Sequence, residues 1–108
     1  MKEYRCWREV VAEEDDPAAV LARLYVEELA RLAREAGHRV EAHWDSAPEL
    51  VMAALADEEG WVDGGLLNLA EERAFNRYRR EYAWRLGPVD DEDEIIERYK
   101  QICWANGL

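Results

Sequence analysis

The sequence predicts an α+β fold, in which a small βαβ-containing sheet packs with four helices in the order β-α-β-α-α-α. Three observations predict this class: two short segments of alternating apolar and charged residues, a helical pattern between them, and three further helical patterns behind them. A strand, a helix and a second strand in succession should cross over right-handed and leave the strands parallel. With 108 residues, 49% of them apolar, the chain is expected to form a single globular domain over residues 1–108.

The first strand is expected over residues 3–12, which are rich in aromatic and β-branched types. The helix that follows begins at Asp16 and Pro17, because aspartate suits the N-cap and proline suits the first helical position. Gly37 marks its end. The apolar stripe that we expect to face inward consists of Leu21, Tyr25, Leu29, Leu32 and Ala36.

A second strand is expected over residues 38–45, with apolar and charged side chains on opposite faces. Ser46, with Glu49 three positions later, has the pattern of a capping box and opens a helix that ends before Gly60. Residues 61–67 contain Gly64 and Gly65, and they fit either a loop or a short third strand. The sheet therefore has two strands, or three if this segment pairs into it.

The third long helix is expected over residues 69–86, opened by Asn68 with Glu71 and stopped by Gly87 and Pro88. Its apolar stripe consists of Phe75, Tyr78, Tyr82 and Leu86. A last helix opens within residues 90–94, where acidic side chains favour a helix N-terminus. A sheet of two strands is marginal alone, so we expect its edge to be covered, most simply in a homodimer.

The composition bounds the location and the chemistry of the protein. No segment resembles a signal-peptide core or approaches the ~18 apolar residues of a membrane span, so a cytoplasmic protein without membrane contact is expected. Cys6 and Cys103 lie outside any CxxC spacing, so we expect two buried thiols, with a bridge between them as the alternative.

Ser46 is the single serine and threonine is absent, so catalysis by a hydroxyl nucleophile is nearly excluded. No cofactor is expected.

The best metal-ligand pattern lies on the second predicted strand and consists of His38, Glu41, His43 and Asp45. Three of these residues alternate, so their side chains would project from one face of a strand. Neighbouring positions on such a face lie about 6.6 Å apart, too far for three ligands to meet without curvature. A solvated strand face is therefore the commoner outcome, and a small metal-binding protein or enzyme is the third hypothesis.

Charge is segregated along the chain, which carries 14 basic and 25 acidic residues and a net charge of -11. Five arginines fall between Arg73 and Arg85, within the predicted helix 69–86. Helical spacing places four side chains of this region on one face, namely Arg73, Arg77, Arg80 and Trp84. Guanidinium groups match phosphate oxygens and an indole stacks on a base, so nucleic-acid binding is the second hypothesis. The alternative is neutralisation by acidic helices of the same chain or of a second copy.

Acidic runs and tryptophans point instead to a protein partner. The runs at residues 13–16 and 90–94 stand directly before predicted helices, where negative charge stabilises a helix, but they could also steer a basic partner. Three of the five tryptophans are hard to bury in so small a body and are predicted anchors: Trp61, Trp84 and Trp104. The leading hypothesis is a nonenzymatic inhibitor, adaptor or regulator that docks on a basic protein surface, steered by Asp91, Glu92 and Asp93.

Overall fold

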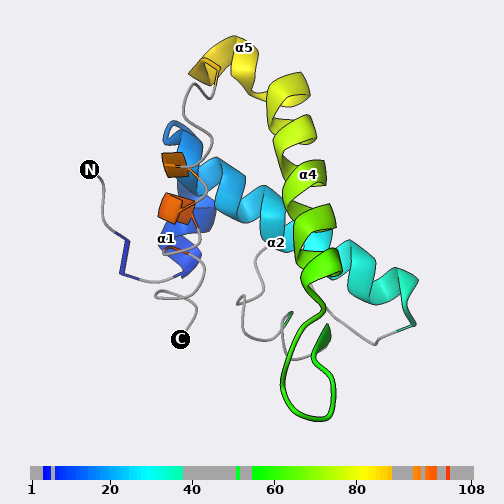
Figure 1. The fold of residues 1–108 in the computed structure, drawn as a ribbon. Coiled ribbons are helices and arrows are strands. Elements are labelled where there is room, and N and C mark those ends of the chain that lie inside the picture. Colours follow the sequence, from blue (N-terminus) through cyan, green and yellow to red (C-terminus); the bar gives the residue numbers. More distant parts are fainter. Residues whose placement is uncertain are drawn as a thin grey trace.

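A computed structural model describes residues 4–5, 7–37, 51, 55–88, 94–95, 97–99 and 102. Within these residues the main elements are α1 (Trp7–Ala12), α2 (Pro17–Glu35), α4 (Gly64–Glu81) and α5 (Ala83–Leu86). Val51, Leu55 and the described residues from 94 onward are also helical. Figure 1 shows α2 and α4 crossing each other, with α1 beside α2 and α5 continuing from the far end of α4.

The predicted α+β class is wrong for the described residues, which contain helices and no strand. The first predicted strand is corrected to the helix α1. Trp7 and Val10 are both buried and lie three positions apart, whereas Arg8 and Glu9 between them are exposed. That spacing places the two apolar side chains on one helical face, so the alternation was assigned the wrong period. The second predicted strand, over residues 38–45, lies outside the described residues.

Both predicted ends of α2 are confirmed. The Asp16 carboxylate accepts a hydrogen bond from the Ala18 amide at 3.1 Å, which satisfies one free donor of the first turn. Its second oxygen accepts a bond from the Tyr4 hydroxyl at 2.5 Å, so the cap also anchors the segment before α1. Gly37 follows the helix at a φ of +88°, a left-handed conformation that glycine adopts without a steric penalty.

Helix α2 is buried on almost every side. The predicted inward residues Leu21, Tyr25, Leu29 and Leu32 are buried, but Ala36 is exposed beyond the last turn. Val20 and Ala22 are also fully buried, although they lie on other faces of the helix. Its exposed residues are Arg31, Arg34 and Glu35 near the C-terminal end, and the rest of the helix is covered by neighbours that include α1 and α4. It is the central element of the core.

Helix α4 begins earlier than predicted. Asp63, not Asn68, is the N-cap, and its carboxylate accepts a bond from the Gly65 amide at 2.7 Å. Residues 61–63 therefore form an irregular lead-in, and the third strand considered for residues 61–67 is absent. The predicted helix 69–86 is interrupted at Tyr82, which separates α4 from the short α5.

The buried face of α4 follows the predicted stripe in part. Phe75 and Tyr78 are buried, together with Ala70 and Ala74, while Tyr82 and Leu86 are half-buried. Gly87 ends α5 at a φ of +92°. Within the described part of the chain, no helix is long and apolar enough to cross a membrane.

Aromatic rings join the C-terminal helical residues to the core. Tyr99 lies 5.3 Å from the Tyr25 ring of α2 and 6.2 Å from the Phe75 ring of α4, measured between ring centroids. The three rings are tilted or edge-on, which is the arrangement that aromatic pairs prefer. Ile102 is buried as well, so both Tyr99 and Ile102 belong to the core.

Candidate interaction surfaces

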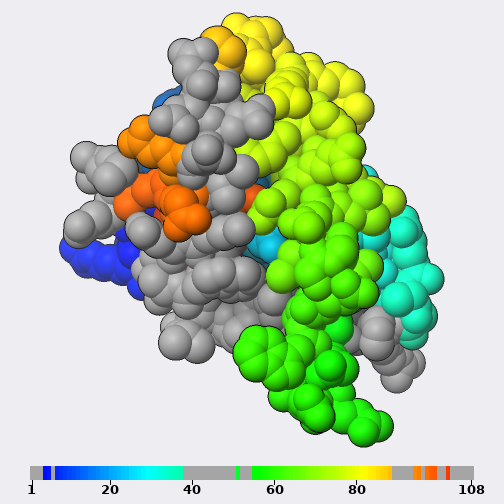
Figure 2. Space-filling model, viewed as in Figure 1, coloured from blue at the N-terminus to red at the C-terminus, as the bar shows by residue number. Residues whose placement is uncertain are grey.

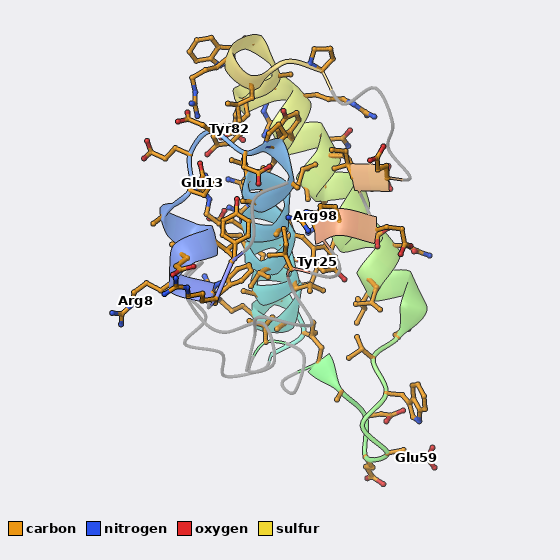
Figure 3. The ribbon with its side chains drawn as sticks, turned by 90° about the vertical axis from the view of Figure 1, so that its left-hand side faces the viewer. Arg8, Glu13, Tyr25, Glu59, Tyr82 and Arg98 are labelled. Atoms are coloured by element: carbon orange, nitrogen blue, oxygen red, sulfur yellow. The ribbon has the colours of Figure 1, made fainter. Side chains whose placement is uncertain are left out.

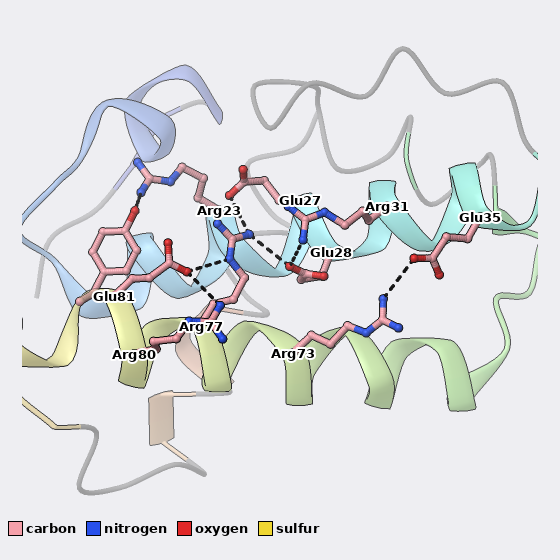
Figure 4. Close-up of polar contacts among 10 residues, drawn as sticks. Arg23, Glu27, Glu28, Arg31, Glu35, Arg73, Arg77, Arg80 and Glu81 are labelled. Atoms are coloured by element: carbon pink, nitrogen blue, oxygen red, sulfur yellow. Dashed lines mark hydrogen bonds and ion pairs between the residues drawn. The ribbon is translucent and has the colours of Figure 1, made fainter.

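The crossing of α2 and α4 contains a partly buried ionic cluster centred on Arg77. Its guanidinium group donates to Glu28 at 3.2 Å and to Glu27 at 3.5 Å, both on α2, and to Glu81 on α4 at 3.2 Å. The side chain of Glu28 is only 2% exposed, and it also accepts a bond from Arg31 at 3.3 Å. Figure 4 shows this network bridging the two helices.

Arg77 is held firmly in its charged form. Burial alone would lower the pKa of the guanidinium, but the negative charges of Glu27, Glu81 and Glu28 outweigh burial and raise it. Three carboxylates therefore occupy the donors of a side chain that is 17% exposed. A buried charge is tolerated only with such partners, and this cluster joins the two helices at their crossing.

A groove of about 370 Å³ runs beside this cluster and contains the predicted arginine face. Its lining consists of Glu28, Arg31, Glu35, Arg73, Asn76, Arg77 and Arg80. Two of the contacts along it are loose, since Arg73 lies 3.8 Å from Glu35 and Arg80 lies 3.5 Å from Glu81. The structure therefore brings Arg73, Arg77 and Arg80 to one surface, where each faces a carboxylate of the same chain.

Trp84, the fourth member of the predicted arginine face, lies on α5 and does not line the groove. Its indole N–H donates to the Glu81 carbonyl at 2.7 Å, and the residue is 79% exposed. Trp84 therefore lies outside the groove that Arg73, Arg77 and Arg80 line.

The segment that carries Trp84 is tied to the rest of the molecule. Arg85 donates to the Asp15 carboxylate at 3.1 Å and to the Glu14 carbonyl at 2.9 Å, so the acidic run before α2 has an intramolecular partner. The Tyr78 hydroxyl donates to the Gly87 carbonyl at 2.9 Å. The Arg85 bonds thus tie α5 to the segment before α2, and the Tyr78 bond ties the end of α5 back to α4.

The loop of residues 57–63 presents the other exposed indole, with Trp61 73% exposed. One oxygen of the Asp57 carboxylate accepts bonds from the amides of Glu59 and Trp61, each at 2.9 Å. The Asp57 amide donates in turn to the Trp61 carbonyl at 2.9 Å, and Gly60 turns the chain at a φ of +89°. The loop is therefore closed by the carboxylate and the amide of Asp57, and it projects from the helical body in Figures 1 and 2.

The remaining predicted site residues fall outside the described residues. They are Trp104, Asp91, Glu92 and Asp93 among the partner-binding candidates, and His38, Glu41, His43 and Asp45 among the metal candidates. Cys6 and Cys103 also fall outside them. Where the structure does describe the chain, no group of three or more His, Cys, Asp or Glu side chains could hold a metal ion.

Sequence reasoning missed two features of these surfaces. Glu28 is a buried carboxylate, and the signal for it was its helical spacing, since Leu24 and Leu32 lie four positions to either side. The acidic residues around Trp61 were also overlooked, although Asp57, Glu58, Glu59 and Asp63 stand within seven positions. Comparisons with protein-family models, with curated proteins and with solved structures found no match.

Proposed function

We propose that the protein is a nonenzymatic interaction domain that docks on a basic surface of another protein as an inhibitor, adaptor or regulator. The observation that carries the proposal is the exposure of Trp61 and Trp84, at 73% and 79%. Tryptophan is enriched at the centres of protein interfaces, where its large apolar surface is removed from water. An exposed indole at each end of the helical body supplies the anchors that such a domain requires.

Charge supports a basic partner. The chain carries a net charge of -11, so its field attracts positively charged surfaces and repels phosphate backbones. Within the arginine-rich segment, Arg77 is occupied by three carboxylates, which favours a protein partner over nucleic acid. The steering role of Asp91, Glu92 and Asp93 stays a prediction, as does the anchoring role of Trp104.

The experiment is a pull-down with the full-length chain from a lysate of the native host, repeated with the double variant Trp61→Ala/Trp84→Ala. Each bait is washed at low and high salt, with and without nuclease. We expect a defined basic protein that survives nuclease treatment, is released by high salt and is depleted on the double variant. Recovery of nuclease-sensitive material, or equal recovery on both baits, would contradict the proposal.

Self-association needs its own measurement. The predicted homodimer was argued from an uncovered sheet edge, and the described residues contain no sheet. Without a sheet edge, a homodimer would instead form through the exposed side chains of Trp61 or Trp84. Sedimentation of the wild-type chain and of the double variant at micromolar concentration tests this point, since only a tryptophan-mediated dimer dissociates on substitution.

A further inference from the structure

We infer that the loop of residues 57–63 is the primary docking element of the chain, and that it fits a protein surface in which lysine or arginine side chains surround an apolar pocket. This inference rests on the proposed function and identifies which of the two exposed tryptophans performs it. The indole of Trp61 would fill the pocket, and the acidic side chains beside it would contact the basic rim.

The first argument is charge. Residues 57–63 contain four carboxylates and no basic side chain, which gives the loop a local charge of -4 around one exposed indole. The carboxylates of Asp57 and Asp63 are used to close the loop and to cap α4. Glu58 and Glu59 are exposed and have no ion pair in the part of the chain that the structure describes. Their charge is therefore available to a partner, and it selects a basic one.

The second argument is preorganisation. The Asp57 carboxylate and amide together make three hydrogen bonds that hold Glu59 and Trp61 in one loop conformation. Fixing a binding loop in advance lowers the entropic cost of association. In Figure 3, Glu59 lies at the tip of the loop, away from the packed helices, so a partner could reach it without displacing any helix.

The third argument is the contrast with Trp84. The segment around Trp84 uses its polar groups internally, since Arg85 binds the acidic run before α2 and the Trp84 indole N–H binds the Glu81 carbonyl. Trp61 has a different setting, because its backbone amide and carbonyl bind Asp57 while its side chain remains exposed. Among the described residues, the loop thus presents an exposed indole beside two carboxylates, those of Glu58 and Glu59, that form no ion pair within the fold.

The test is site-specific photo-crosslinking with the full-length chain in host lysate. A benzophenone-bearing amino acid replaces Trp61 in one sample and Trp84 in a matched control, and mass spectrometry maps the crosslinked partner peptide. We expect position 61 to crosslink to a basic patch of a protein, with a weaker yield or none at position 84. Crosslinks from position 61 to nucleic acid, to a second copy or to a neutral or acidic protein patch would overturn the inference.

The purified partner then allows a quantitative test by titration calorimetry. We expect Trp61→Ala to weaken binding at least about 30-fold, as for a central anchor. The double charge reversal Glu58→Lys/Glu59→Lys should weaken binding and remove most of its salt dependence, whereas Trp84→Ala should change affinity less than about threefold. Circular dichroism of each variant verifies that the helices are intact.

The outcomes separate this inference from the function on which it rests. If position 84 crosslinks to a protein and position 61 does not, the loop is not the docking element, but the interaction domain stands. If the chain captures no protein at either position, both the inference and the proposed function fail.

Discussion

The acidic loop of residues 57–63 and the arginine segment from Arg73 to Arg85 each carry one exposed tryptophan, but they use their charges in opposite ways. All five arginines of the segment have a partner within the chain, among them Glu35 for Arg73 and the Phe75 ring, 6.0 Å away, for Arg79. Glu58 and Glu59 of the loop have no ion pair among the described residues. A cluster of charge in the sequence is therefore not equivalent to charge that a partner can use.

The physical reason lies in where each region sits. The arginine segment lies along α4, which packs over the central helix α2, and acidic side chains of α2 face it across the crossing. Guanidinium groups form strong hydrogen bonds with such carboxylates, so the segment becomes part of the fold. The loop projects beyond the helices, where no cationic side chain of the described residues reaches it.

The largest expected effect is on the arginine segment. Arg77→Ala should lower the free energy of unfolding by about 3 kcal/mol, because it leaves the buried Glu28 carboxylate with Arg31 as its remaining partner. Urea denaturation followed by circular dichroism measures this change. The matched control is Arg80→Ala, whose side chain is 71% exposed and which should cost less than about 0.5 kcal/mol. Equal losses of stability for the two variants would show that the carboxylate partners of Arg77 contribute no more to folding than the exposed contact of Arg80 does.

The next effect concerns the attachment of α5. Tyr78→Phe should cost about 1 kcal/mol at neutral pH, because the Gly87 carbonyl loses its hydroxyl donor. Tyr82→Phe is the matched control on the half-buried ring beside it, where the hydroxyl accepts a bond from Arg23 at 2.7 Å. Chemical denaturation of both variants compares them. A larger loss of unfolding free energy for Tyr82→Phe would mean that the bond from Arg23, and not the bond to Gly87, holds α5 in place.

Tyr78 also gives the arginine segment a pH dependence. Burial raises the pKa of the Tyr78 hydroxyl above its ordinary value of about 10, so the folded state binds its proton more tightly than the unfolded state does. The resulting stability is present below pH 10 and is lost as the pH rises through the folded pKa. Wild-type stability should therefore fall above pH 10, and Tyr78→Phe should fall less steeply in denaturation experiments across that range. Parallel curves for the two proteins would contradict this assignment.

A smaller effect is expected from loosening the loop. Asp57→Ala removes an exposed loop carboxylate that accepts two backbone hydrogen bonds, so global stability should fall by only about 0.5 kcal/mol. Amide hydrogen exchange at Glu59 and Trp61 should nevertheless accelerate, while exchange in α2 should stay unchanged. Unaltered exchange at both loop amides would mean that the Asp57 carboxylate does not order the loop.

The smallest effect on folding is expected for Glu58 and Glu59, which form no ion pair among the described residues. Glu58→Lys/Glu59→Lys should change the free energy of unfolding by less than about 0.5 kcal/mol, because surface substitutions without packed or paired neighbours rarely matter. Thermal and urea denaturation of the double variant measure it. A loss above 1 kcal/mol would show that these side chains contribute to the fold, and the contrast with the arginine segment would disappear.

Much of the central helix was predictable from local signals. Asp16, Pro17 and Gly37 define the ends of α2 through capping chemistry that needs no tertiary partner. Trp61 and Trp84 were also expected to be hard to bury in so small a body, and both are exposed, although their binding roles remain proposals. The start of α4 was missed because Asn68 and Asp63 both suit an N-cap, and only the folded chain shows that Asp63 binds the Gly65 amide.

What the sequence by itself determined is therefore local: the ends of α2, its apolar face, the excess of acid and the clustering of arginine. The tertiary structure decided that residues 7–12 form a helix, because Trp7 and Val10 reach the core together only at helical spacing. It also decided which charged side chains form ion pairs within the chain, since Arg77 binds Glu27 and Glu28 some fifty positions away in the sequence. Pairing of that kind depends on how two helices cross, and no local pattern contains it.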